Sequence, residues 1–185
     1  MPTIYTNDVN VRITTFNSLP KIDDLLDLDA IFMRGAPGSG KSTMAKEISD
    51  EFGDREGLSI DDYAVVLETD DYWIRPDGFY DFQAKHLGRA HDWCFETFVH
   101  HIAIGRRVIL CNTNIELLHM ARYIEAIIND RGKADVAFIQ LNSDYGNVHG
   151  VPNEVVDRMR NRLAIESTPE RIQEFANTFK NCVSI

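Results

Sequence analysis

The chain has 185 residues, of which 44% are hydrophobic and 10% aromatic, which suits one folded domain and excludes a disordered chain. Its formal charge of −10 argues against a broad, nonspecific grip on nucleic acid, which usually needs a basic surface. No apolar run approaches the roughly 20 residues that span a bilayer, and the N-terminus lacks the pattern of a secretory signal, so we expect a cytoplasmic protein without a membrane partner.

The first 29 residues are expected to form an N-terminal extension. Within it, residues 10–16 alternate between the two sides of an extended chain, which predicts a short strand or an edge hairpin. The main domain is expected over residues 30–185.

Short apolar runs and helical periodicities alternate along the main domain. The apolar runs predict buried strands at 30–33, 64–67, 108–111 and 136–141. The helical spacing of apolar residues predicts helices over 41–52, 84–104, 116–130, 153–164 and 168–180. This alternation indicates an α/β fold with a parallel sheet of about four to five strands, helices on both faces and a C-terminal helical lid.

The strongest motif is a glycine-rich loop between the first strand and the first helix of the main domain. It satisfies the P-loop pattern GxxxxGK[ST] with Gly35, Ala36, Pro37, Gly38, Ser39, Gly40, Lys41, Ser42 and Thr43. The glycines let backbone N–H groups turn toward an anionic phosphate, and the following helix points its positive end at the same place. We expect Lys41 to reach the β- and γ-phosphates and Ser42 to ligate magnesium. The motif therefore predicts a P-loop NTPase fold with ATP and Mg²⁺ as cofactors.

Polar residues follow two further strands, at the sheet edge where ligands bind in this fold class. Asp70 is our candidate for the base that accepts the proton of an attacking hydroxyl, and for a metal ligand beside Ser42. Its neighbour Asp71 either contacts the substrate or caps a turn. Asn112 and Asn114 either orient a phosphate or the acidic pair, or serve only as turn residues.

Three segments, taken in order, resemble a known family. Gly35–Thr43, Thr69–Tyr72 and Asn112–Asn114 look like the kinase module of bacteriophage-type 5′-hydroxyl polynucleotide kinases and of the related polynucleotide-kinase-like AAA-type P-loop proteins. The resemblance covers about residues 30–165. The first motif is shared by very many proteins, whereas the ordered set is much more specific.

The resemblance implies roles for several residues. Asp70 matches the general base of the family, which also places arginines on a lid over the phosphates. Arg158 is the nearest candidate for a catalytic arginine of this kind, and Arg160 for one that binds the nucleotide. His149 stands in the expected lid turn as a candidate ligand. If the chain is viral, its location would be the host cytoplasm.

The chain also departs from the family pattern. Phage enzymes carry an arginine directly after Asp-Asp-Tyr, where this chain has Trp73, and Arg75 is the candidate substitute for binding the substrate. Asn112 stands where the phage pattern has an aspartate, and residues 144–150 lack the usual basic side chains. These changes leave ATP binding in place and leave the acceptor open.

The leading hypothesis is a kinase that transfers the γ-phosphate of ATP to a hydroxyl of a nucleic acid, most simply a 5′-OH end of DNA or RNA. Its alternatives are a kinase of a hydroxymethylated base in DNA or of a small nucleoside-like molecule, and an ATP-binding regulatory module that transfers nothing. The aromatic segment Tyr72–Phe82 follows Asp70 and forms either a wall of the acceptor pocket or a packed loop. The sequence makes no prediction of the oligomeric state.

Overall fold

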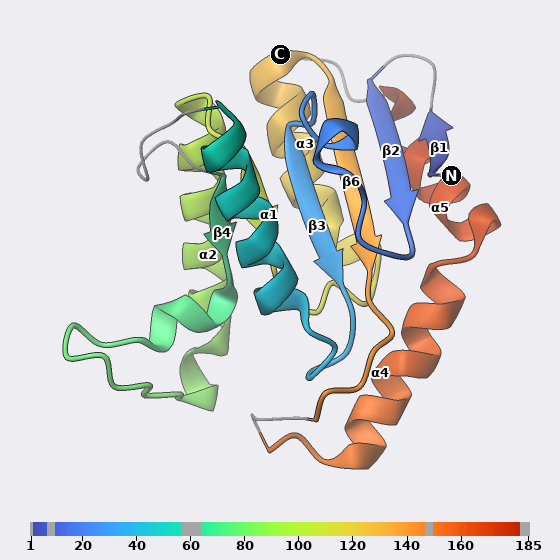
Figure 1. The fold of residues 1–185 in the computed structure, drawn as a ribbon. Helices are drawn as coiled ribbons and strands as arrows, with labels where there is room; N and C mark the ends of the chain where they lie inside the picture. Colours follow the sequence, from blue (N-terminus) through green and yellow to red (C-terminus); the bar gives the residue numbers. More distant parts are fainter. Residues whose placement is uncertain (1, 7–9, 57–63, 147–149, 182–185) are drawn as a thin grey trace.

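Six strands form one sheet in the computed structural model, which describes residues 2–6, 10–56, 64–146 and 150–181 (Figure 1). The strands are β1 (Thr3–Thr6), β2 (Val11–Phe16), β3 (Ala30–Arg34), β4 (Val65–Leu67), β5 (Val108–Leu110) and β6 (Ala134–Gln140). Their order in the sheet is β1-β2-β6-β3-β5-β4. All neighbours pair in parallel except β1 and β2, which form an antiparallel pair at one edge.

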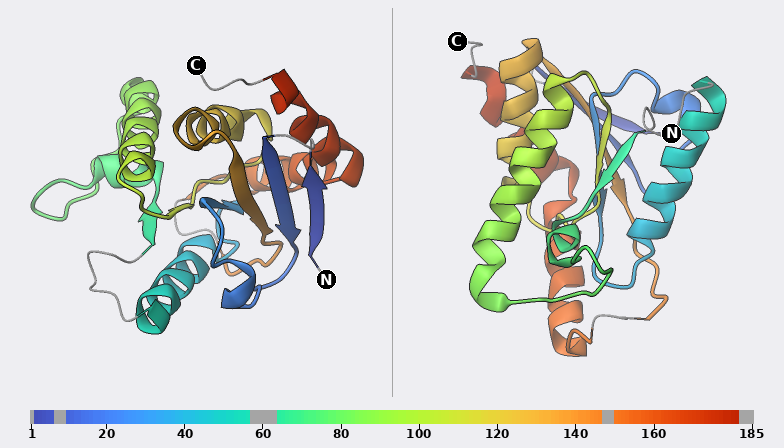
Figure 2. Two further views of the ribbon diagram at one scale, coloured as in Figure 1. Left: turned by 90° about the horizontal axis from the view of Figure 1, so that it is seen from above. Right: turned by 90° about the vertical axis from the view of Figure 1, so that its left-hand side faces the viewer.

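Helices cover both faces of this sheet (Figures 1 and 2). They are α1 (Lys41–Glu56), α2 (Leu87–Ala103), α3 (Leu118–Arg131), α4 (Asn153–Glu166) and α5 (Pro169–Asn177). Helix α1 packs on one face, whereas α2, α3 and α5 pack on the other. The predicted α/β fold is therefore confirmed, with one strand more than the four to five expected.

The central strand β3 separates two apolar cores. Phe32 faces the core shared with α2 and α3, and Ile31 and Met33 face the core shared with α1. All five residues of β3 are buried, because neighbouring strands flank it and helices cover both its faces. This burial on both sides explains why the strand reads as a continuous apolar run and not as an alternating one.

Strand β1 pairs antiparallel with β2 at one edge of the sheet, in the segment where the sequence left a short strand or an edge hairpin open. Only Tyr5 of its four residues is buried, so the segment carries little periodic signal. Strand β2 pairs with both β1 and β6, and its Ile13 is fully buried in the main core. The strands that precede residue 30 thus belong to the same sheet as the rest of the chain.

Helix ends differ from expectation in one informative place. Helix α1 continues past residue 52, where its predicted range ended, through Gly53 to Glu56. By contrast, α3 stops at Gly132, which adopts a left-handed conformation with φ 77°. An interior glycine weakens a helix by only about 1 kcal/mol, so packing of Phe52 and its neighbours can carry α1 through it. Among the described helices, each is too short or too polar to cross a membrane.

Candidate active site

The P-loop joins the end of β3 to the start of α1, at the edge where the parallel strands end (Figure 1). Gly38 and Gly40 have φ values of 79° and 88°, a left-handed region that side chains rarely tolerate. A Cβ on Gly35 would lie 2.8 Å from the Leu141 carbonyl oxygen and would also strike Ser39. Positive φ values and steric clashes therefore explain why the loop has glycine at these positions.

Lys41 starts helix α1 and is 8% exposed. Its ammonium donates a hydrogen bond to the Ala36 carbonyl oxygen at 2.9 Å, so the side chain is folded back over the loop. Burial lowers the pKa of Lys41, and the nearby Cys111 and Glu68 side chains oppose that lowering. A buried ammonium with these neighbours is ready to exchange its carbonyl partner for a phosphate oxygen.

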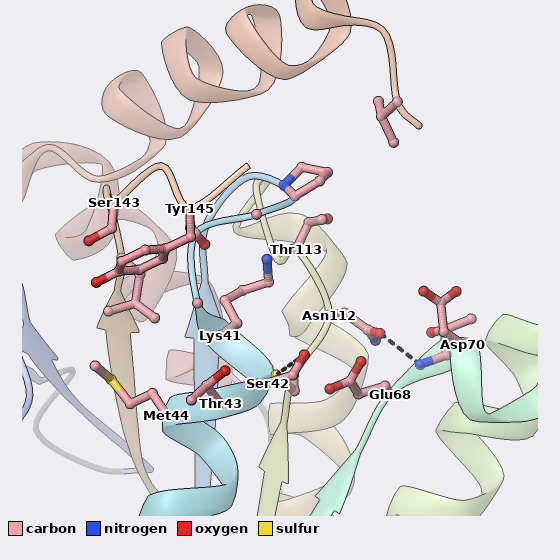
Figure 3. Close-up of a pocket in the computed structure, with 18 of the residues that line it drawn as sticks. Lys41, Ser42, Thr43, Met44, Glu68, Asp70, Asn112, Thr113, Ser143 and Tyr145 are labelled. Carbon is pink, nitrogen blue, oxygen red and sulfur yellow. Dashed lines mark hydrogen bonds between the residues drawn. The ribbon is translucent and has the colours of Figure 1, made fainter. Parts of the chain in front are cut away.

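One cavity of about 710 Å³ extends along the loop (Figure 3). Met44, Leu141 and Tyr145 line what we call the Tyr145 end. Asp70 lies at the opposite side, where the His91 ring approaches the hydroxyl of the neighbouring Thr69 to 3.5 Å, and we call this the Asp70 end. Figure 3 shows Lys41 and Ser42 between Tyr145 and Asp70, so the loop separates the two ends of one continuous space.

Tyr145 is held beside the P-loop by its main chain. Its N–H donates to the Gly38 carbonyl oxygen at 2.9 Å. Its ring passes so close to Gly40 that a Cβ there would lie 3.0 Å from a ring carbon. The ring is nevertheless 78% exposed, so a flat aromatic face is available at this end of the cavity.

Glu68 follows β4 directly and was not among the residues singled out in the sequence. It lines the cavity and lies between Ser42 and Asp70 (Figure 3). Its charge acts on both Lys41 and Cys111, and the Cys111 thiol lies 3.9 Å from the Ser42 hydroxyl. Burial raises the pKa of Cys111 strongly, so this thiol stays neutral and leaves Glu68 as the anion beside Ser42.

The oxygens of Ser42 and Glu68 suit magnesium, which prefers hard ligands and usually keeps most of its shell for water and substrate phosphates. In keeping with this, no group of three or more His, Cys, Asp or Glu that could hold a metal occurs among the described residues. The sequence favoured Asp70 as the partner of Ser42. The structure offers Glu68 as the nearer carboxylate, which a search for the Asp-Asp pair passed over.

The two neighbouring aspartates have different surroundings. Asp70 lines the cavity, and burial together with the charge of Asp70 raises the pKa of Tyr80. Asp71 instead accepts a hydrogen bond from the Glu68 N–H at 3.0 Å and completes a capping box at the start of the turn 69–73. The sequence left two interpretations of Asp71 open, a contact with the substrate and a cap of a turn. The geometry supports the cap.

Asn112 and Asn114 also separate. Asn112 lines the cavity, and its side-chain oxygen accepts a hydrogen bond from the Thr69 N–H at 2.8 Å, which fixes the turn that carries Asp70. Asn114 is buried with φ 46°, and its amide nitrogen donates to the carbonyls of Met33 and Leu110 at 2.8 and 3.1 Å. Asn114 thus ties the ends of β3 and β5 together, and it is not among the described residues that line the P-loop cavity.

The arginines predicted for the site lie outside the described cavity lining. Arg160 on α4 pairs with Asp144 at 2.9 Å, and the charge and hydrogen bond of Arg160 lower the pKa of Asp144. Arg158 is exposed on the same helix. Arg75 pairs with Asp77 at 3.3 Å in the aromatic segment. His149 lies outside the described residues.

A further arginine, which the sequence did not draw attention to, organises the base of the site. Arg34 is 1% exposed at the end of β3, directly before the P-loop. It donates to the carbonyl oxygens of Asn114 and Ile115 at 3.0 and 2.9 Å and to the Ser167 hydroxyl at 3.2 Å. Burial lowers its pKa to about 10, so it keeps its charge at neutral pH, and Glu166 nearby supports that charge. One buried cation therefore links β3, the loop after β5 and the end of α4.

The chain is similar to proteins of known sequence and structure. The human NEDD4-binding protein 2 (Homo sapiens) is 28% identical over 174 residues, which cover 82% of this chain and 9% of that protein. The chain thus spans less than a tenth of the length of this relative. A gluconokinase structure from Sinorhizobium meliloti 1021 is 13% identical with a TM-score of 0.36, over 84% of this chain and 75% of that one. The signature of an AAA domain family matches residues 31–134, more than half of the chain. The chain therefore belongs to this AAA domain family.

Proposed function

We propose that the protein is an ATP-dependent kinase that transfers the γ-phosphate to a hydroxyl of a nucleic acid, most simply the 5′-OH end of a polynucleotide. One observation carries the proposal. Asp70, a carboxylate able to accept a proton, shares a cavity with Lys41 and Ser42 of the phosphate loop. A module that only bound ATP would have no use for a base on the far side of the phosphates.

The nucleotide would bind with its phosphates on the P-loop and its base toward the Tyr145 end. Loop N–H groups, the start of α1 and Lys41 supply the positive field for the triphosphate. Ser42 and Glu68 would hold a magnesium ion, which would offset the negative charge of the phosphates. The exposed face of Tyr145 offers a stacking surface for adenine.

The acceptor would enter from the Asp70 end. Its hydroxyl oxygen attacks the γ-phosphorus in line, and the bond from that phosphorus to the β–γ bridging oxygen breaks. The electron pair of the broken bond leaves with ADP, and the hydroxyl proton passes to Asp70. Most of the acceleration would come from positioning and charge stabilisation.

The choice of a nucleic-acid acceptor is supported by the ordered motifs around Gly35–Thr43, Asp70 and Asn112. The acidic balance of the chain limits the contact to a few nucleotides at an end. A hydroxymethylated base in DNA and a small nucleoside-like molecule present similar hydroxyls, so they belong in the same experiment.

Incubation with γ-labelled ATP and a panel of 5′-OH oligonucleotides, nucleosides and hydroxymethylated DNA tests the proposal. We expect label on the oligonucleotides, at the 5′ position, and none when their 5′ ends already carry phosphate. Label only on a nucleoside or on hydroxymethylated DNA would replace the proposed acceptor. ATP binding without label on any acceptor would point to a regulatory module and contradict the kinase assignment.

A further inference from the structure

The segment that follows Asp70 forms a small hairpin that projects from the body of the molecule (Figures 1 and 2). Residues 73–82, which we call the aromatic hairpin, are closed by an antiparallel bridge between Ile74 and Tyr80. The Arg75 N–H donates to the Phe79 carbonyl at 2.9 Å, and Gly78 turns the chain with φ 81°. The projection is therefore held by its own backbone hydrogen bonds.

The aromatic hairpin exposes an unusual set of side chains. Phe79 is 60% exposed, and Phe82 and Ile74 are each more than half exposed. Phe82 packs edge-on against the buried Trp73, with ring centroids 5.2 Å apart, so it is anchored from beneath. The Arg75 guanidinium lies over the Phe79 ring, 5.8 Å from its centroid. The hairpin therefore exposes flat apolar ring faces on a segment that is held by backbone hydrogen bonds and by the contact between Trp73 and Phe82.

The hairpin is physically joined to the chemistry. It follows directly on the turn 69–73, which carries Asp70 into the cavity. The Asp81 N–H donates to the Trp73 carbonyl oxygen at 2.9 Å, so the base of the hairpin is tied to that turn. The chain returns from the hairpin to Leu87, which lines the same cavity. Whatever rests on the hairpin therefore lies at the side of the cavity opposite Tyr145.

We infer that the aromatic hairpin is a stacking platform for bases near the 5′ end of a single-stranded acceptor. This inference rests on the proposed function. It specifies that the acceptor is single-stranded and that its bases contact the aromatic hairpin. Base–aromatic stacking is tolerant of sequence and needs exposed flat rings, which Phe79 and Phe82 supply. The exposed side chains of Lys85 and Arg89 follow the hairpin and supply positive charge for the phosphates beside the bases.

The test compares two 5′-OH hexanucleotides with the same backbone, one with all its bases and one abasic at its first three positions. The steady-state KM of each is measured for the wild type and for Phe79→Ala, Phe79→Trp and Ile104→Ala. Ile104, 56% exposed at the end of α2, is a matched control for loss of exposed apolar surface away from the site. The KM for ATP, measured in parallel, reports whether each variant keeps its folded nucleotide site.

We expect the wild type to favour the base-bearing hexamer, and Phe79→Ala to raise its KM by about 5- to 100-fold, as loss of one stacked base predicts. The KM for ATP should stay unchanged, Phe79→Trp should restore binding, and Ile104→Ala should behave as the wild type. Equal KM values for the two hexamers in the wild type would overturn the inference while the kinase assignment stands. So would a wild-type dimer that Phe79→Ala converts to monomers, because a second copy would then cover the hairpin. Failure to label any oligonucleotide would remove the proposed function itself.

Discussion

The two ends of the cavity are built in different ways. Around Lys41 the contacts for a ligand come mainly from the main chain of one continuous loop, with a helix start behind it. The Asp70 end is assembled from side chains on separate elements, with Asn112 fixing the turn that carries Asp70 and His91 of α2 lining the same cavity. A loop made of backbone donors leaves a fixed spacing of glycines in the sequence, whereas an assembled pocket leaves only scattered polar residues. The nucleotide side can therefore be read from a motif, and the acceptor side needs the fold.

The largest effect is expected from the loop itself. Lys41→Met removes the buried cation that faces the phosphates, so transfer should fall by about 10²- to 10³-fold and ATP binding should weaken with it. Rates of label transfer and ATP titration measure both. Lys46→Met, an exposed lysine on the same helix, is the matched control and should leave both unchanged.

A smaller effect is expected at the carboxylate beside Ser42. Glu68→Gln keeps the shape of the side chain and removes its charge, so half-saturation with Mg²⁺ should move up by roughly tenfold, as loss of a supporting ligand predicts. A magnesium titration of the transfer rate measures this. An unchanged requirement for magnesium would return the metal role to Asp70, where the sequence first placed it.

Tyr145 sharpens the comparison between the two ends. Tyr145→Ala should raise the KM for ATP by about fivefold or more, because a stacked base would lose its ring, while the KM for the acceptor stays constant. Tyr145→Phe keeps the ring and should behave as the wild type. A rise in the acceptor KM instead would mean that the two ends have been assigned in reverse.

The smallest effect concerns His91 at the Asp70 end. Partial desolvation lowers the pKa of His91, Arg122 and His119 lower it further, and Asp92 and Asp70 oppose that lowering. The unfolded chain therefore takes up this proton first as the pH falls, and the stability contribution is lost from about pH 6.5 down to the folded pKa. His91→Asn should reduce the drop in melting temperature between about pH 7.5 and about pH 5. His100→Asn, on the exposed side of α2, serves as control, and an identical acid profile for both variants would contradict the assignment.

Much of the fold followed from periodicity, since strands buried on both faces and amphipathic helices leave strong local patterns. Strand β1 did not, because only one of its four residues is buried. At the site, Gly35 and Lys41 were evident from their spacing alone. Asp71 and Asn114 were ambiguous because caps and ligands use the same residue types, and only their hydrogen bonds distinguish the two.

Arg34 and Glu68 were missed for a related reason. An arginine before the P-loop reads as a surface charge until the fold buries it against the carbonyls of another loop. Glu68 precedes a more conspicuous aspartate pair, and its position beside Ser42 depends on how β4 and β5 are placed relative to α1. Such pairings across the sheet cannot be read from local sequence.

The most direct test of the account separates binding from transfer at Asp70. With Asp70→Asn, we expect the dissociation constant for ATP with Mg²⁺ to stay close to that of the wild type while label transfer falls by about 10²-fold or more. Asp71→Asn, one residue away in the capping box, should leave transfer nearly intact. Equal loss of ATP binding and of transfer in Asp70→Asn, or a larger loss of transfer in Asp71→Asn, would contradict the placement of the base at the acceptor side of the cavity.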